Sequence, residues 1–339
     1  MRLLICVQSV DTKDDPLLGF FHGWLMELSK HFESIQVICL REGEHNLPKN
    51  IQVHSLGKES GESRLKYIAR FYTHLATIRG TYDRVFVHMN PHYVLLGGLY
   101  WKLKHTPIFF WRNHAKMNLM TRIAARLAKK VFYTSPYACM SVFKHALQMP
   151  VGIDTRLFTP AAGGVEEHIP KKILFLGRLS PVKCVELFID AAMLAPPKYE
   201  FHVFGDAPTR DALYAGRLKA KAGKNVFFHA SVKNEDTPSV YRAHDLYVNL
   251  TPAGSMDKTV LEAIACGTPT LVSNTSFSGI LPSSSLLSPV TKEQLAQQIV
   301  ACTSTEMRDQ KAMLEYSRSI VAEKHSLEKL ATMLYNVMK

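Results

Sequence analysis

The sequence has no short-spaced cysteines and no long apolar segment, and it lacks the common phosphate-binding signatures. Its six cysteines are scattered without a C-x-x-C pair, which favours buried thiols in a reducing compartment over a disulfide framework or a zinc site. The apolar start of the chain stops at Val7 without a small-residue cleavage site, so it predicts a buried strand and not a signal peptide. The longest apolar stretch elsewhere, Tyr93–Trp101, is far too short to span a membrane. No G-x-G-x-x-G and no G-x-x-x-x-G-K-[ST] occurs, which disfavours a dinucleotide-dependent dehydrogenase and a P-loop enzyme.

The composition is otherwise that of an ordinary globular protein. The 339 residues are 47% hydrophobic and 21% charged, enough for a sizeable core, and the length favours two domains. The formal net charge of +12 is uneven: residues 1–155 hold 20 Lys/Arg against 11 Asp/Glu, and residues 156–339 hold 21 against 18. The basic first half indicates an anionic partner: a membrane surface, a lipid-phosphate acceptor or nucleic acid. A solvated basic surface without a partner is the alternative.

Buried strands alternate with amphipathic helices along the chain, which predicts an α/β protein with parallel sheets covered on both faces. In the first half, strand signals lie at Arg2–Val7, Gln36–Leu40, Ile51–Ser55, Arg84–His88, Ile108–Trp111 and Lys130–Tyr133. In the second half, they lie at Lys172–Leu176, Glu200–Phe204, Val226–His229, Asp245–Asn249 and Thr270–Ser273. Helical patterns occur at Gly19–His31, Asn118–Lys129, Thr259–Ala265 and Ser326–Met338. A Pro- and Gly-containing break predicts two doubly wound domains, 1–158 and 171–325, with a linker at 159–170 and a terminal helix at 326–339.

The loop after the strand at Lys172–Leu176 reads GRLSPVK, in which Ser180 and Pro181 suit a helix start. Ligands of open parallel sheets bind beyond the carboxyl ends of the strands, where helix N-termini point. Arg178, as a planar fork, and Lys183, as a point charge, would there clamp a diphosphate. Taken alone, these two residues are equally well interpreted as exposed loop cations.

A second loop, TPAGSMDK, precedes the short helix at Thr259–Ala265. Gly267 supplies a left-handed stop, and Pro269 leads into the next strand. Glu262 lies on this helix among apolar neighbours, where a carboxylate needs a partner. It forms either a buried ion pair or an acceptor for sugar hydroxyls, since carboxylates bind ribose diols in nucleotide sites.

These two loops, in this order, carry a resemblance to a known family. The runs ILFLGRLSPVKCVELFIDAA and YRAHDLYVNLTPAGSMDKTVLEAIACGTPTLVSN closely resemble family 4 (group 1) glycosyltransferases of the GT-B fold. FHVFGDAPTRDAL resembles the Gly-Asp loop of that family, and VGIDTRLF resembles its interdomain signature. The specific part covers Lys172–Asn274, and the first half matches loosely. The resemblance implies two Rossmann-like domains facing a central cleft, with the acceptor bound by 1–158, the nucleotide sugar by 171–325, and the terminal helix packed back on the first domain.

The resemblance also implies roles for single residues. Arg178 and Lys183 would bind the donor diphosphate, and Glu262 its ribose. The Gly-Asp loop would add Gly205 and Asp206 to the donor site. The loop before the short helix would face the donor sugar with Gly254, Ser255, Met256, Asp257, Lys258 and Thr259.

One position departs from the family pattern. The family carries a second Glu eight positions before the one matched by Glu262, and this chain has Gly254 there. Asp257 or Lys258 is the candidate catalytic replacement, and Lys258 would offset negative charge that develops on the leaving diphosphate. The alternative is that Asp257 only caps the following helix, as Asp often does.

The first half contributes candidates for the acceptor side. The family has a His in a strand-end loop near the acceptor and donor sugar, and His114 in IFFWRNHAKMN is the best match for this catalytic position. His88, which ends the strand in VFVHMNPHY, is the competitor, and a structural role is the alternative for both. Asn90 and Arg112 stand in the same two loops and are assigned to the acceptor side. Gly19, in the loop after the first strand, would let the backbone approach the diphosphate.

The resemblance implies transfer of a hexose-type sugar from a nucleotide-diphosphate sugar to a glycan or lipid-linked acceptor, with retention of configuration. No cofactor and no metal are expected, because Arg178 and Lys183 supply positive charge and no Asp-x-Asp metal pair is evident. The basic helix at 118–130 suggests docking on an anionic membrane face. The hypothesis is therefore a cytoplasmic enzyme, peripheral on the inner face of the cytoplasmic membrane, in bacterial surface polysaccharide synthesis.

Other functions are compatible with the same motifs. A nucleotide-sugar epimerase or a glycan phosphorylase would use the same fold for another reaction. A non-catalytic, degenerate binding subunit is a further alternative, and Gly254 is the reason to consider it. A nucleic-acid partner is not expected, because no recognition motif and no basic–aromatic interleaving is seen.

Overall fold

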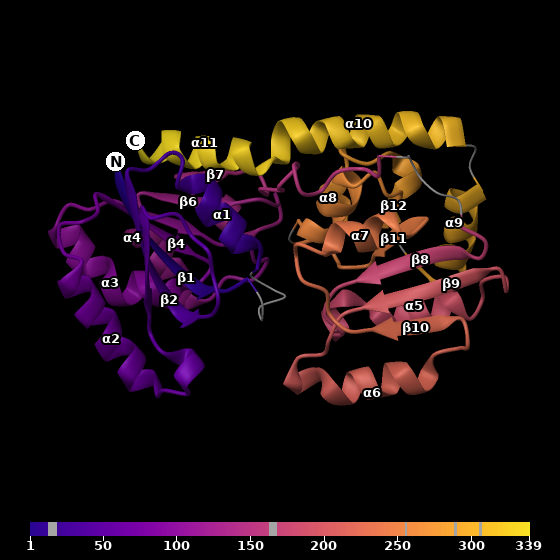
Figure 1. Cartoon of the computed structure of the whole chain (residues 1–339), viewed down its shortest axis with the longest axis horizontal. Coiled ribbons are helices and arrows are strands. Elements are labelled where there is room, and N and C mark those ends of the chain that lie inside the picture. Colours follow the sequence, from indigo (N-terminus) through magenta and orange to yellow (C-terminus); the bar gives the residue numbers. More distant parts are fainter. Residues whose placement is uncertain (13–18, 163–167, 255, 288–289, 305–306) are drawn as a thin grey trace. The chain divides into compact units, whose positions relative to one another are not determined.

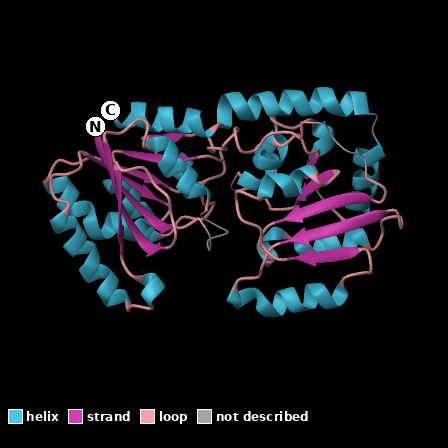
Figure 2. Cartoon of the chain, in the orientation of Figure 1, coloured by secondary structure: helices cyan, strands magenta, loops and turns pink. Residues whose placement is uncertain are grey.

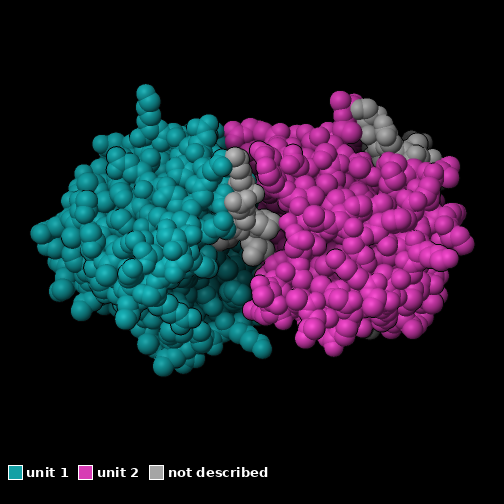
Figure 3. Space-filling view, turned by 60° about the horizontal axis from the view of Figure 1, so that its bottom comes forward, with its two compact units in different colours: residues 1–152, 327–339 teal, residues 153–326 magenta. Residues whose placement is uncertain are grey.

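The computed structural model describes residues 1–12, 19–162, 168–254, 256–287, 290–304 and 307–339, with the side chains of 307–311 left aside. The chain separates into two compact units (Figure 3). The first unit comprises Met1–Gly152 and Leu327–Lys339, and the second comprises Ile153–Ser326. The first unit therefore ends a few residues before the predicted boundary at 158, and the predicted linker at 159–170 belongs to the second unit.

The helices and strands of each unit alternate along the chain (Figures 1 and 2). The strands of the first unit are β1 (Arg2–Val10), β2 (Ser34–Glu42), β3 (Ile51–Ser55), β4 (Arg84–His88), β5 (Ile108–Trp111), β6 (Lys130–Tyr133) and β7 (Ala146–Gln148). Its helices are α1 (Phe20–Leu28), α2 (Arg64–Thr77), α3 (Pro91–Leu103), α4 (Leu119–Leu127) and α11 (Leu327–Met338). The strands of the second unit are β8 (Lys171–Leu176), β9 (Tyr199–Phe204), β10 (Val226–His229), β11 (Leu246–Asn249) and β12 (Thr270–Val272). Its helices are α5 (Val185–Ala192), α6 (Ala212–Lys221), α7 (Thr237–Arg242), α8 (Lys258–Ala265), α9 (Lys292–Ser304) and α10 (Met307–His325).

The first unit is built on a parallel sheet with the strand order β3-β2-β1-β4-β5-β6-β7. β1 reads RLLICVQSV, an almost unbroken apolar run that is typical of a strand buried on both faces. Successive side chains of a strand point to opposite faces. Accordingly, Leu3 and Ile5 join one buried cluster, while Leu4 and Cys6 join another. The sheet is therefore covered on both sides, as predicted from the alternation of elements.

Helix α11, from the end of the chain, covers one of these faces beside α1 (Figure 1). Leu330 and Leu334 of α11 pack in the same cluster as Trp24 of α1 and Leu3 of β1. Arg84 at the start of β4 donates from Nε to the carbonyl oxygen of Met338 at 2.9 Å. The last helix is thus a structural part of the first unit.

The second unit contains a parallel sheet with the strand order β10-β9-β8-β11-β12. Ile173 and Phe175 of β8 pack with Phe188 of α5 and Ile299 of α9 in one cluster. Helix α8 contacts β11 and β12, and also α7 and α10. In both sheets the chain order reverses once, between β1 and β4 in the first unit and between β8 and β11 in the second. Such switch points leave a crevice outside the carboxyl ends of the strands, where ligands bind in α/β proteins.

Two small elements of the first unit add to what the sequence predicts. The three-residue strand β7 was not predicted, because so short a segment carries no periodic signal. Helix α4 turns small residues inward, with Thr121 and Ala124 fully buried. Its larger apolar residues face outward: Leu119 is 72% and Ile123 41% exposed, and they alternate with exposed arginines.

The cysteines behave as the sequence predicts. All six are free; Cys6, Cys39, Cys139 and Cys266 are buried, and Cys184 and Cys302 are half-buried. Burial raises the pKa of each of these thiols, so they are present in the protonated form. Within the described ranges, none of the helices combines the length and hydropathy needed to cross a bilayer.

Candidate functional site

The loops after β8 and β9 lie against each other at the carboxyl edge of the second sheet. The amide of Gly177 donates to the carbonyl oxygen of Phe204 at 3.0 Å. Gly205 has a φ of 142°, which side chains rarely adopt, and a Cβ there would overlap the Gly177 carbonyl. This close approach therefore requires glycine. The Asp206 carboxylate accepts a hydrogen bond from the amide of Ser231 at 3.1 Å and ties the loop after β10 to the same edge.

A tight turn after β8 presents Lys183. Residues Pro181–Lys183 form a 3-10 turn, and Cys184 follows in the left-handed region with φ 51° and ψ 37°. Helix α5 begins only at Val185, so the predicted helix start at Ser180 is a separate short turn that precedes the α-helix. A left-handed residue other than glycine is strained, and such strain is frequently found at functional sites.

Lys183 forms an ion pair with Asp257 of the loop after β11. Its Nζ donates to Oδ2 of Asp257 and also to Oγ1 of Thr251 at 3.2 Å. The same carboxylate oxygen accepts from Nδ2 of Asn249 and from Oγ1 of Thr251, both at 3.1 Å. The Lys183 and Asp257 side chains are each only 14% exposed. Because β8 and β11 are neighbours at the switch point, their loops bring these distant residues together.

Asp257 occupies the N-cap position of α8, yet its side chain makes no capping hydrogen bond. The interpretation of Asp257 as a side-chain cap is therefore wrong; its carboxylate points to Lys183 instead. Burial alone would raise the pKa of Asp257. The charge of Lys183 and the hydrogen bonds from Lys183, Asn249 and Thr251 outweigh this effect and lower the pKa to about 2. Asp257 is thus an anion at neutral pH.

A buried network supports this ion pair. The Tyr247 hydroxyl donates to Oγ1 of Thr259 at 2.7 Å and accepts from Nδ2 of Asn249 at 2.9 Å, while Oδ1 of Asn249 accepts from the amide of Thr251 at 3.1 Å. Thr259, assigned to the donor side from the sequence, is half-buried, and its hydroxyl accepts this hydrogen bond from Tyr247. Sequence analysis missed Asn249 and Thr251. The available signal was a polar residue ending the buried strand LYVN, because buried amides need partners.

Glu262 is nearly closed to solvent at 5% exposure and accepts from the hydroxyl of Tyr241 at 3.3 Å. Burial raises its pKa to about 7, an effect that Lys258 opposes and Asp257 strengthens. Burial likewise lowers the pKa of Lys258 to about 8, opposed by the charge of Glu262. Lys258 and Glu262 stand four residues apart on α8, so they share one face of the helix. The charges of Lys258 and Glu262 thus influence each other, and the two interpretations of Glu262 drawn from the sequence both stay predictions.

The remaining donor-side residues have different surroundings. Arg178 is half-buried, and its guanidinium makes no hydrogen bond or ion pair with the described part of the chain. Gly254 is buried with a φ of 145°, and Met256 is 7% exposed. Ser255 lies outside the described residues. Lys183 is therefore paired in this unit, whereas Arg178 remains available for an anion.

In the first unit, His88 lies within the aromatic core. It is 4% exposed, and its ring centroid stands 4.8 Å from that of Phe21 and 5.5 Å from that of Trp24. Asn90 is the N-cap of α3, and its Oδ1 accepts from the amide of His92 at 3.1 Å. Packing and capping give both residues structural roles, the alternative stated above for His88.

The carboxyl end of β4 contains a strained residue. Met89 has a φ of 64°, and its carbonyl oxygen accepts from Nη1 of Arg112 at 2.7 Å. Burial lowers the pKa of Arg112. His114 is exposed, and its carbonyl oxygen accepts from the amide of Cys139 at 2.8 Å. Gly19 is the N-cap of α1 with a φ of −51°, a conformation open to any residue. Met89 thus follows β4, and Arg112 and His114 follow the neighbouring strand β5.

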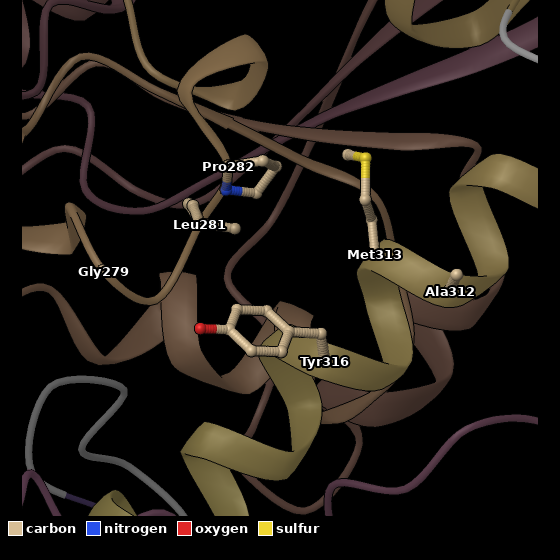
Figure 4. Close-up of a pocket in the computed structure, with 6 residues that line it drawn as sticks. All are labelled: Gly279, Leu281, Pro282, Ala312, Met313 and Tyr316. Carbon is tan, nitrogen blue, oxygen red and sulfur yellow. The ribbon is translucent and has the colours of Figure 1, made fainter.

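A separate apolar hollow is present in the second unit (Figure 4). It lies between a loop and α10, and its lining residues are Gly279, Leu281, Pro282, Ala312, Met313 and Tyr316. None of them was singled out from the sequence. The described lining residues are apolar apart from the hydroxyl of Tyr316.

Part of the chain is similar in sequence to known proteins. Residues 170–305 match the profile of the family described as glycosyl transferases, group 1. Mannosylfructose-phosphate synthase of Agrobacterium fabrum is 31% identical over 147 residues, which cover 38% of this chain and 32% of that protein. The chain thus spans about a third of the length of the curated relatives it matches. The matched profile covers both β8 and the loop before α8, and it supports the resemblance to group 1 glycosyl transferases over that segment.

Solved structures resemble the whole chain. HepE of Anabaena, crystallised with UDP and glucose, has a TM-score of 0.78 at 16% identity, over 99% of this chain and 98% of that one. Sucrose-phosphate synthase of Thermosynechococcus elongatus has a TM-score of 0.75 at 15% identity, over 99% and 98%. The predicted fold, two Rossmann-like doubly wound α/β units of the GT-B type, is confirmed.

Proposed function

We propose that this chain is a glycosyltransferase that moves a hexose-type sugar from a nucleotide-diphosphate sugar to a glycan or lipid-linked acceptor. We infer retention of configuration and no requirement for a cofactor or a metal ion. The observation that carries the proposal is the position of Arg178 and Lys183, two cations at the carboxyl end of β8 within the segment that matches group 1 glycosyl transferases. The UDP in the HepE crystals supports the same class of donor.

In the proposed reaction, the bond between the anomeric carbon and the diphosphate oxygen breaks, and the acceptor hydroxyl oxygen bonds to that carbon. The hydroxyl proton is released, and the nucleoside diphosphate leaves with the bonding electrons. Arg178 and Lys183 stabilise the negative charge on this leaving group, which is the largest electrostatic demand of the step. Lys258, one turn from Glu262 on α8, adds a further cation, and Glu262 binds the ribose.

The remaining candidates keep the roles that the resemblance implies. Gly205 and Asp206 shape the loop under the diphosphate, and the Gly254–Lys258 loop faces the donor sugar. His114 acts on the acceptor side together with Arg112. Each of these roles is a proposal that rests on the strand-end position of the residue.

We further propose that the first unit docks on an anionic membrane face. Between Asp83 and Asp154 the sequence contains ten Lys/Arg and no acidic residue. Helix α4 lies within this stretch and exposes Leu119 and Ile123 next to Arg122. Exposed apolar side chains beside cations suit the interface of anionic lipids. Such docking fits a peripheral enzyme on the cytoplasmic leaflet that extends a lipid-linked surface polysaccharide.

A donor screen tests the proposal directly. Thermal unfolding of the purified chain is measured with UDP-, GDP-, ADP- and dTDP-sugars, since a ligand that binds the folded state raises the midpoint. The stabilising donor is then incubated with candidate acceptors, and sugar transfer is followed by mass spectrometry. We expect one nucleotide class to stabilise the protein and to yield a glycosylated acceptor.

The same assay identifies the rival functions. Conversion of the donor without any acceptor would indicate an epimerase, and a requirement for orthophosphate would indicate a phosphorylase. Binding of a donor without hydrolysis or transfer would indicate a non-catalytic binding subunit. Stabilisation by no nucleotide sugar at all would contradict the proposed function.

A further inference from the structure

The contacts of the Asp257 carboxylate match those that a phosphate oxygen would need. Oδ2 accepts from the ammonium of Lys183, the hydroxyl of Thr251 and the amide of Asn249. A cation, a hydroxyl and an amide N–H are the donors that proteins use for phosphate oxygens as well. The carboxylate and a phosphate group therefore suit the same set of donors.

The position of Asp257 makes this arrangement unusual. An Asp at the N-cap normally accepts from the first-turn amides of its own helix. Here the side chain forms no such bond with α8 and turns to the β8 loop instead. The first turn of α8 keeps the partial positive charge of a helix N-terminus, which favours an anion nearby. The Asp257 carboxylate thus lies near the N-terminus of α8 and contacts both Lys183 and the Thr251 hydroxyl.

The two proposed diphosphate ligands consequently differ in state. Lys183 is neutralised by Asp257, whereas Arg178 has no partner within the described residues. A diphosphate that engages both cations has to share Lys183 with the carboxylate or displace it.

We propose that Asp257 is an internal competitor of the donor diphosphate: its carboxylate holds Lys183 before the donor binds and yields it to a phosphate oxygen. This inference rests on the proposed function, because it assigns Lys183 to the diphosphate. Asp257 lowers the affinity for the nucleotide sugar and, equally, for the nucleoside diphosphate product. The pKa of about 2 keeps the carboxylate charged throughout the physiological range, so the competition does not vary with pH there.

The test is a calorimetric titration of the whole chain with inorganic pyrophosphate and with UDP. Asp257→Asn keeps the size of the side chain and an acceptor oxygen but removes the charge. We expect binding to tighten about tenfold, the effect of removing one like charge several ångströms from the ligand at an effective dielectric constant of about 20 or more. Unchanged or weaker binding overturns the proposal, and weaker binding would make Asp257 a residue that positions Lys183.

A double-mutant cycle establishes that the competition is for Lys183. In a Lys183→Met background, Asp257→Asn should give little or no gain in pyrophosphate affinity. A gain as large as in the wild-type background overturns the mechanism, because general charge repulsion would then suffice.

Two further variants keep the test decisive. Asp257→Ser should show the same gain in pyrophosphate affinity as Asp257→Asn, and it replaces that variant if Asp257→Asn does not fold. Thermal unfolding establishes which variants are folded. Glu186→Gln removes an exposed carboxylate of α5 that faces Lys221 at 3.4 Å, and it should leave the affinity unchanged. A gain in Glu186→Gln equal to that in Asp257→Asn also overturns the proposal.

The outcomes separate this inference from the proposed function. Tighter pyrophosphate binding by Asp257→Asn, with no sugar transfer by any variant, supports the competition and contradicts the transferase. Sugar transfer with no change in the pyrophosphate affinity of Asp257→Asn supports the transferase and contradicts the competition.

Discussion

Tyr241 donates its hydroxyl hydrogen to Oε2 of Glu262 at 3.3 Å in the interior of the second unit, where the two side chains are 0% and 5% exposed. This hydrogen bond is the described contact that stabilises the ionised form of Glu262 besides the charge of Lys258. Burial outweighs both effects and raises the pKa of Glu262 to about 7, so the carboxyl group keeps its proton up to about that pH. The charge of this proposed ribose ligand therefore changes near neutral pH.

Glu262→Gln should flatten the pH dependence of stability. A glutamate of the unfolded chain loses its proton near pH ~4.3, whereas Glu262 in the folded state keeps it to about pH 7. Between these values the folded state holds the additional proton, so stability falls as the pH rises and the loss is complete above about pH 7. Urea unfolding measures the free energy of unfolding at pH ~5 and at pH ~8. The decrease between the two pH values should be larger in the wild type than in Glu262→Gln by on the order of 1 kcal/mol. Identical losses would contradict the raised pKa.

Arg178→Ala and Lys183→Ala should each lower the rate of sugar transfer about 10²–10³-fold, because each removes a charge that stabilises the leaving diphosphate. The measurement is the steady-state rate with the donor found by the thermal screen. Arg217→Ala, which removes an exposed cation of α6 in the same unit, is the matched control and should leave the rate unchanged. Full activity of either site variant would refute the diphosphate assignment.

Lys258 should give the transfer reaction a falling limb at alkaline pH. Burial lowers its pKa to about 8, so the ammonium is charged below that pH and loses its charge as the pH rises through it. We expect kcat to fall above about pH 8 in the wild type. Lys258→Arg keeps its charge and should remove this limb from a profile measured between about pH 6 and 10. If kcat still falls at alkaline pH in Lys258→Arg, a group other than Lys258 causes the fall.

Gly205→Ala should destabilise the second unit by about 3 kcal/mol or more, since the new Cβ would strike backbone and not a movable side chain. Gly216→Ala is the contrasting variant, because a Cβ at this exposed position of α6 meets nothing within 4 Å. It should stabilise the helix by about 0.5–1 kcal/mol. Chemical denaturation of both variants measures the difference. Equal stabilities would mean that the loops after β8 and β9 separate easily.

Reversal of charge on α4 should abolish membrane docking. Arg122→Glu with Arg126→Glu replaces two exposed cations, each worth about 1 kcal/mol near an anionic surface. Flotation with vesicles that contain phosphatidylserine measures binding, and neutral phosphatidylcholine vesicles give the background. Arg217→Glu with Lys224→Glu makes the same charge change in the second unit and should still float. Equal binding of the wild type to both kinds of vesicle contradicts the docking proposal.

Most of the fold could be predicted from the sequence because buried parallel strands are continuous apolar runs. Arg84–His88 and Ile108–Trp111 were predicted with the bounds that the structure shows. The helix start after β8 was placed too early, because Ser180 and Pro181 open a 3-10 turn as readily as an α-helix. Only tertiary contacts decide between the two.

The charged residues of the candidate site were predictable from the sequence, but their pairing and the supporting Asn249 and Thr251 were not. Ligands of parallel sheets bind beyond the carboxyl ends of the strands, and this rule indicates Lys183 and Asp257 separately. The two loop sequences do not reveal that β8 and β11 are neighbours in the sheet. The preference of Asp for N-cap positions predicts a hydrogen bond to the first turn of α8. In the structure the Asp257 carboxylate instead forms an ion pair with Lys183, which is distant in the sequence. His88 illustrates the opposite case: a histidine at a strand end looked functional, yet three-dimensional packing surrounds it with Phe21, Trp24 and Trp111.

The location of α11 also has a consequence for the order of folding during synthesis. Leu327–Lys339 belongs to the first unit, although the whole second unit lies between it and Gly152 in the chain. The apolar surface formed by Leu3, Trp24 and their neighbours therefore stays without its helical cover until translation of these last residues. The first unit is therefore completed only after the second unit has been translated, and its exposed face has to be kept from aggregation for the whole of that interval.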